Sequence, residues 1–109
     1  MERVYNKLVR DNIPQIIENK GETPIIRTLD DVEYKKELEK KLYEEYKEVI
    51  DASGDDRVEE LADMMEVISA LAKLENNSLD DVIAIAKKKS EKRGAFDKKI
   101  FLEKVIEDN

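Results

Sequence analysis

The sequence predicts an all-α fold in a single domain that spans residues 1–109. Apolar residues recur at the three- and four-residue spacing of helices, and residues that cap or break helices separate these stretches. Charged residues make up 43% of the chain and apolar residues 40%, a balance that suits helices with narrow buried faces. Four helices with short joints predict a four-helix bundle-type fold with short N- and C-terminal extensions.

The first helix is expected over about residues 11–20. Pro14 falls in its first turn, where a missing backbone N–H is tolerated, and Gly21 is expected to end it. The following stretch, 23–29, contains Pro24 and two isoleucines. It predicts an extended connector or a short edge strand.

The second helix is expected to begin after Asp30, which has the residue type of an N-cap. Glu33 follows three residues later, the spacing of a capping box. This helix is expected to continue to about residue 52, where the joint 53–55 closes it around Gly54. A third helix is then predicted over about 56–75.

The fourth helix is expected to begin at Ser78, because Ser78 and Asp81 again have the spacing of a cap, and to run to about Arg93. Gly94 is expected to end it. The apolar tail over 95–109 predicts an extended arm or a final short helix.

Composition narrows the chemistry that the chain can perform. It has no Cys and no His, which excludes disulfides, thiolate or imidazole metal ligands, and catalysis by either residue. Any metal is therefore a hard cation held by oxygen, with Mg²⁺ first and Mn²⁺ as the alternative. The net charge of −7 argues against duplex nucleic acid as a partner. No apolar run predicts a membrane span or a signal peptide, so the expected location is the cytoplasm.

Two acids of the second helix stand out by their position. Leu38, Leu42 and Val49 lie within about 40° of one another on a helical wheel and define its buried stripe. Glu45 lies inside this stripe, about 20° to the other side of Leu38. Glu48 lies at the edge of the stripe. Glu44 points well away from it and is expected to be exposed.

The third helix carries a second pair of acids on its apolar side. Glu60 and Asp63 flank Val67, opposite the polar sector of that helix. An unpaired ionised carboxylate is costly to bury, so it shifts its pKa, finds a base or binds a cation. No Lys or Arg falls in the buried sector of either helix near these acids. The pattern therefore favours a metal site formed by both pairs over ion pairs or hydrated edge positions.

The same residues carry a resemblance to a known family. Glu44-Glu45-Tyr46-Lys47-Glu48 followed by Glu60-Leu61-Ala62-Asp63 resembles the EExxE…ExxD signature of all-α nucleoside triphosphate pyrophosphatases. The opening stretch 5–14 and the later stretch 92–96 are similar to a MazG-like, phosphoribosyl-ATP pyrophosphohydrolase-like subfamily. The resemblance extends from Tyr5 to about Leu102, and the eleven residues between Glu48 and Glu60 lie at the short end of the family's spacing.

The resemblance implies hydrolysis of a nucleotide between its α- and β-phosphates by a homodimer or a higher homo-oligomer. Clearance of non-standard nucleotides is one role that it implies. By position, the implied metal ligands are Glu45, Glu48, Glu60 and Asp63. Glu48 is the first candidate for the catalytic base and Glu44 the second. The basic residues implied to bind the substrate phosphates are Lys7, Arg10, Lys89, Lys92 and Arg93.

Two other functions stay open from the sequence. One is an enzyme restricted to phosphoribosyl-ATP, and the other is a non-catalytic helical dimerisation or regulatory module. The apolar coverage of the third helix exceeds what one four-helix protomer easily buries. Together with the oligomers that the resemblance implies, this coverage leads us to expect at least a homodimer.

Overall fold

The computed structural model describes residues 1–107 and confirms the all-helical prediction. Its helices are α1 (Ile13–Asn19), α2 (Asp31–Asp51), α3 (Gly54–Leu74) and α4 (Leu79–Arg93). No strand occurs within residues 1–107, so the stretch 23–29 is a connector without a sheet. The part of the predicted tail at 108–109 lies outside the described residues.

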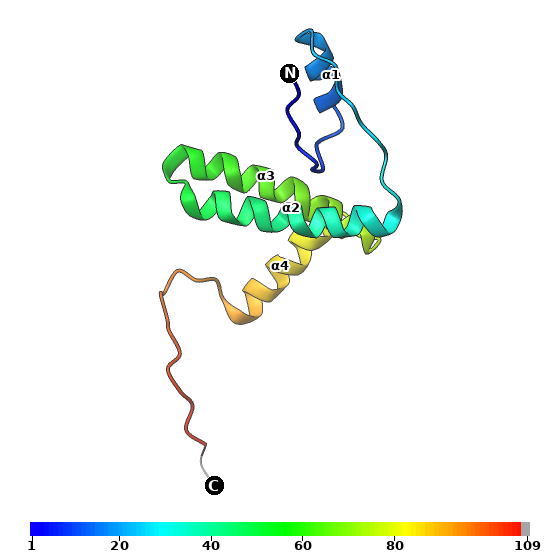
Figure 1. Ribbon diagram of the computed structural model, residues 1–109. Helices are drawn as coiled ribbons and strands as arrows, with labels where there is room; N and C mark the ends of the chain where they lie inside the picture. Colours follow the sequence, from blue (N-terminus) through cyan, green and yellow to red (C-terminus); the bar gives the residue numbers. More distant parts are fainter. Residues whose placement is uncertain (108–109) are drawn as a thin grey trace.

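The helices pack against one another less extensively than the helices of a closed four-helix bundle. Helix α2 folds back on α3 as an antiparallel pair, and α4 packs against α3 (Figure 1). Helix α1 lies apart and packs against none of the other described helices. The molecule measures 69 × 33 × 24 Å, so a single chain does not close the predicted bundle.

Capping explains where α2 and α4 begin. The side chain of Asp30 accepts a hydrogen bond from the backbone N–H of Glu33 at 2.8 Å. The reciprocal bond of a full capping box is absent, and the Glu33 carboxylate instead pairs with Arg27 at 2.8 Å. Ser78 and Asp81 form both bonds of the box at the start of α4.

The joint between α2 and α3 is tighter than predicted. Helix α3 begins at Gly54, so only two residues connect the helices. Gly54 has φ +59°, a conformation that glycine adopts without a steric penalty, which explains the early start. The Nε of Arg57 donates to the carbonyls of Val49 and Ala52 at 3.1 and 2.9 Å. Arg57 thereby satisfies carbonyls at the end of α2 and fixes the turn.

The hydrophobic core of the single chain is small. Leu38 of α2 and Val67 and Ala72 of α3 are its buried apolar residues. Leu61, an apolar residue of α3, is 44% exposed. The described residues include no helix that is long and apolar enough to span a bilayer.

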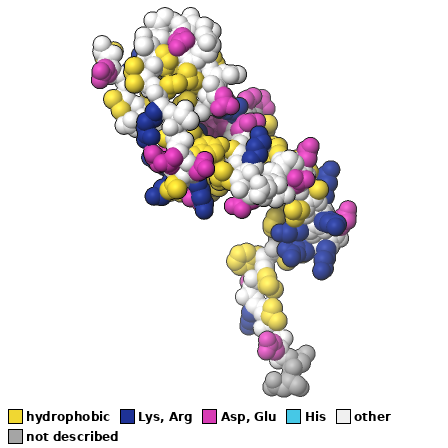
Figure 2. Space-filling view, turned by 90° about the vertical axis from the view of Figure 1, so that its right-hand side faces the viewer, with side chains coloured by type: hydrophobic (Ala, Val, Ile, Leu, Met, Phe, Trp, Pro, Cys, Tyr) yellow, Lys and Arg dark blue, Asp and Glu magenta, His cyan; other side chains and the backbone are white. Residues whose placement is uncertain are grey.

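The described part of the C-terminal tail, 95–107, forms an extended arm rather than a helix (Figure 1). It leaves the end of α4 and points away from the paired helices. Its apolar side chains are exposed, and they are visible along the arm in Figure 2. They are Phe96, Ile100, Phe101, Leu102, Val105 and Ile106.

Candidate metal centre

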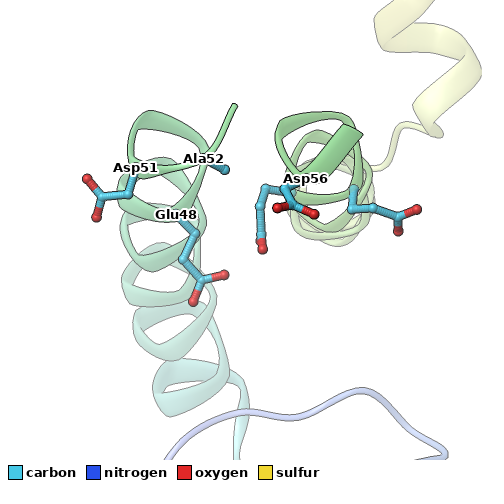
Figure 3. A pocket seen from close by; sticks show the side chains of 6 residues that line it. Glu48, Asp51, Ala52 and Asp56 are labelled. Atoms are coloured by element: carbon cyan, nitrogen blue, oxygen red, sulfur yellow. The ribbon is translucent and has the colours of Figure 1, made fainter. Parts of the chain in front are cut away.

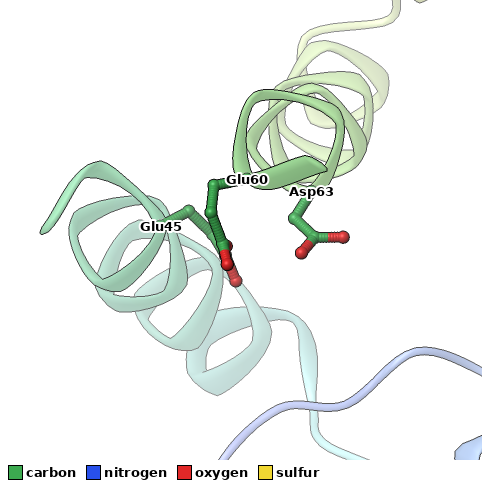
Figure 4. Close-up of side chains that lie close together, drawn as sticks. All are labelled: Glu45, Glu60 and Asp63. Carbon is green, nitrogen blue, oxygen red and sulfur yellow. The ribbon is translucent and has the colours of Figure 1, made fainter. Parts of the chain in front are cut away.

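Three carboxylates meet at the contact between α2 and α3. Glu45 comes from α2, and Glu60 and Asp63 come from α3 (Figure 4). One oxygen of each residue lies within 4.8 Å of the others. The short joint and the antiparallel packing bring the last turns of α2 beside the first turns of α3. The acids that stand apart in the sequence therefore converge in space. We call these three residues the acidic cluster.

Burial within the acidic cluster leaves two oxygens without partners. Glu45 is only 7% exposed, which confirms its predicted place in the buried stripe of α2. The Oε2 atoms of Glu45 and Glu60 are both buried and lack any hydrogen-bond partner among residues 1–107. Leaving a buried acceptor unsatisfied destabilises a fold, and native structures rarely do so. A cation bound by these oxygens would supply the missing partner, so the residues fit a hard metal ion.

The electrostatics of the acidic cluster agree with this assignment. Burial raises the pKa of Glu45, and the nearby carboxylate of Glu48 raises it further, while Lys41 opposes both effects. The pKa of Glu60 is raised to about 7, first by the neighbouring carboxyl group of Glu48, with which a protonated Glu60 can share its proton, and then by burial and by the charges around it. A cation-free cluster therefore holds a proton near neutral pH, and a bound cation would displace that proton.

Glu48, the fourth predicted ligand, lies beside the acidic cluster rather than in it. Its side chain is exposed, and it lies close enough to Glu60 for its carboxyl group to raise the pKa of that residue. Glu48 also lines an open depression of about 360 Å³ at the end of the helix pair (Figure 3). The lining is acidic apart from one alanine and consists of Glu48, Asp51, Ala52, Asp56, Glu59 and Glu60. Glu48 thus connects the cluster to solvent-accessible space.

Two bases reach the acidic cluster: Lys41 of α2 contradicts the expectation that no Lys or Arg lies in the buried sector of either helix near these acids, and Arg10 comes from outside both helices. The Lys41 Nζ lies 3.9 Å from Glu45 Oε1, one helical turn away on α2. This pair has i, i+4 spacing, a signal that the sequence offered. The Arg10 Nη2 lies 2.7 Å from Asp63 Oδ1 and comes from the segment before α1, which no helical pattern reveals. Neither base contacts the two unpartnered Oε2 atoms.

The other predicted base and phosphate-binding residues lie away from these contacts. Glu44 is half-buried, contrary to the expectation that it is exposed, and lies 3.9 Å from Lys41. Within residues 1–107, no ion pair joins the remaining basic candidates to a carboxylate. Lys7 lies over the ring of Tyr5, and the others occupy the exposed second half of α4, where basic side chains gather (Figure 2). These others are Lys89, Lys92 and Arg93.

Comparisons with known proteins leave the family undecided. The chain matches no family model and no solved structure. Over 43 residues it is 54% identical to an uncharacterized protein of Mycolicibacterium smegmatis. This match covers 39% of the chain and 44% of the relative, so it spans less than half of that protein's length.

Proposed function

We propose that the chain is a magnesium-dependent nucleotide pyrophosphohydrolase, which cleaves a nucleoside triphosphate between its α- and β-phosphates to a monophosphate and pyrophosphate. The supporting observation is the buried Glu45, whose unpartnered Oε2 converges with oxygens of Glu60 and Asp63. A hard divalent cation satisfies such a cluster. The reaction class comes from the resemblance of the EExxE…ExxD signature to that of all-α nucleoside triphosphate pyrophosphatases.

The proposed roles follow from position. Glu45, Glu60 and Asp63 hold the cation, with Mn²⁺ as an alternative to Mg²⁺, and Glu48 completes the set from its place beside Glu60. The cation supplies neutralisation of phosphate charge and polarisation of the phosphoryl group. Glu48 is exposed at the open depression, so it can orient a water and accept its proton. Glu44, which faces Lys41, is the second candidate for this base.

Phosphate binding is assigned to the basic residues. The depression beside the acidic cluster is lined mainly by carboxylates, which repel a free triphosphate. Binding there requires a neutralising cation together with bases from outside the depression. Arg10 is the candidate that already reaches the acidic cluster, and a guanidinium contacts phosphate in a bidentate manner. Lys7, Lys89, Lys92 and Arg93 remain further candidates for this role.

The test is release of pyrophosphate from a panel of standard and damaged nucleoside triphosphates and phosphoribosyl-ATP, with Mg²⁺. We expect the wild type to release pyrophosphate and both Glu60→Gln and Asp63→Asn to abolish release. Glu66→Gln, an exposed acid of the same helix outside the acidic cluster, should retain full activity. Full activity in Glu60→Gln or Asp63→Asn would refute the metal assignment.

The same panel separates the alternatives. Activity on phosphoribosyl-ATP alone identifies the narrow enzyme. Inactivity on every substrate, together with a melting temperature that Mg²⁺ does not change, identifies the non-catalytic helical module. The small core and exposed apolar surface give that module its support.

A further inference from the structure

The ion pair between Arg10 and Asp63 joins two parts of the chain that are otherwise weakly connected. The Nη2 of Arg10 lies 2.7 Å from Oδ1 of Asp63, and 53 positions separate the two residues. Among residues 1–107, it is the one hydrogen bond or ion pair that links the segment 1–20 to α2, α3 or α4. Helix α1 makes no close packing contact with these helices. The position of this segment therefore depends strongly on one contact.

This contact is made on a residue of the acidic cluster. Arg10 places a fixed positive charge on Asp63, whose carboxylate offers an oxygen to the same small volume as Glu45 and Glu60. A divalent cation in that volume would compete for the carboxylate and repel the guanidinium. The pair is easily broken, because both side chains are about half exposed and such pairs stabilise weakly.

We propose that Arg10 gates the cation site: it pairs with Asp63 in the cation-free protein, and binding of a divalent cation releases Arg10 together with the segment 1–12. The inference rests on the proposed cation site and adds its regulation. The released guanidinium becomes available to a phosphate oxygen of the substrate. Cation binding then precedes productive nucleotide binding, because the same event completes the metal site and frees the arginine.

If Arg10 instead positioned Asp63 for the cation, its replacement would change the cation affinity in the opposite direction. A guanidinium that held Asp63 in position for the cation would be a positioning residue, and its removal would weaken cation binding. A gate competes with the cation, and its removal strengthens binding. The sign of the change in affinity therefore distinguishes the two roles.

The first measurement is a calorimetric titration with Mn²⁺ of the wild type, Arg10→Gln and Arg3→Gln. Arg3 is the matched control, because it is an arginine of the same segment that pairs with Glu22 instead of the acidic cluster. We expect Arg10→Gln to bind Mn²⁺ about two- to fivefold more tightly, the range that corresponds to the loss of one exposed ion pair. Arg3→Gln should match the wild type.

The second measurement is limited digestion with trypsin, which reports the segment directly. Mn²⁺ should accelerate cleavage after Lys7 and Arg10 in the wild type. Cleavage after Lys98, in the exposed arm, is the internal control and should not change. In Arg10→Gln, cleavage after Lys7 should be fast with or without Mn²⁺. In Glu60→Gln, Mn²⁺ should have no effect.

The outcomes separate the gate from the site on which it acts. Tighter binding by Arg10→Gln with Mn²⁺-accelerated digestion of the wild type supports the gate. Unchanged or weaker binding by Arg10→Gln, with normal binding by the wild type, overturns the gate and leaves the cation site intact. No binding of Mn²⁺ by the wild type overturns both the gate and the proposed cation site.

Discussion

Replacing Glu45 by leucine should have opposite effects on stability with and without a divalent cation. The side chain lies in the apolar stripe of α2 with Leu38, and it is almost fully buried. Its carboxylate is desolvated and lies among other acids, with Lys41 at 3.9 Å as its basic partner. Glu45→Leu removes this charge from the contact between α2 and α3 and puts apolar surface in its place.

The magnitude follows from burial and from linkage. Full burial of a leucine side chain contributes about 1.5–3 kcal/mol, and the lost attraction to Lys41 offsets about 0.2–1 kcal/mol. We therefore expect the free energy of unfolding in EDTA to rise by about 1–2 kcal/mol. For a domain of this size, each 1 kcal/mol raises the melting temperature by about 4–8 °C. In Mn²⁺ at about 100 times its Kd, the free energy of unfolding of the wild type should rise by about 2.7 kcal/mol. That of the variant should not change.

The assay is thermal and urea unfolding of both proteins in EDTA and in saturating Mn²⁺. The variant should be the more stable protein in EDTA and the less stable one in Mn²⁺. Glu39→Leu, an exposed acid on the same helix, should show neither effect. A Glu45→Leu variant that is less stable than the wild type in EDTA would refute the reasoning, because Glu45 would then be a paired structural carboxylate.

Two further predictions concern protons and assembly. Because the pKa of Glu60 is about 7 in the folded cation-free protein and about 4.3 in an unfolded chain, the folded state holds an extra proton between these values. The free energy of unfolding in EDTA should thus fall as pH rises from about 4.5 to 7. The affinity for Mn²⁺ should rise over the same range and then level off. Calorimetry on Glu60→Gln should show neither trend. Since few apolar residues are buried in one chain, sedimentation equilibrium should find at least a homodimer. Met65 lies on the exposed apolar surface of α3, so Met65→Lys should weaken the homodimer. A wild type that is monomeric at micromolar concentration would contradict this expectation.

Local chemistry made much of the fold predictable. The caps at Asp30 and Ser78 act within one helical turn, so the sequence locates the starts of α2 and α4 closely. The burial of Glu45 follows from helical periodicity, because Leu38 lies on the same face. Helix α3 begins two residues before its predicted start, because Gly54, a residue type typical of joints, is its first residue.

Tertiary contacts limited the rest of the prediction. The contact of Arg10 with Asp63 depends on the path of an irregular segment across α3, and no spacing in the sequence encodes that path. Local signals predict the position of helix α1 in the sequence closely. Its separation from the other helices depends on packing between elements, which local signals do not encode. Helix number and short joints favour a four-helix bundle, whereas α1 lies beyond the connector 20–30 and packs against none of the other described helices.

The acidic cluster and the small core have the same physical origin. The contact between α2 and α3 is the main helix–helix interface of the chain, and its central positions carry Glu45 and Glu60 where leucines would bury more apolar surface. Without a cation, these positions leave buried oxygens unpartnered and hold a proton near neutral pH. Arg10 and Lys41 compensate the remaining charge only in part, through one weak contact each to the cluster. A chain built in this way gains stability from whatever occupies the acidic cluster, so cation binding should tighten the α2–α3 pair as a whole. Amide hydrogen exchange along α2 and α3 should therefore slow with Mn²⁺, whereas exchange in the arm 95–107 should not change.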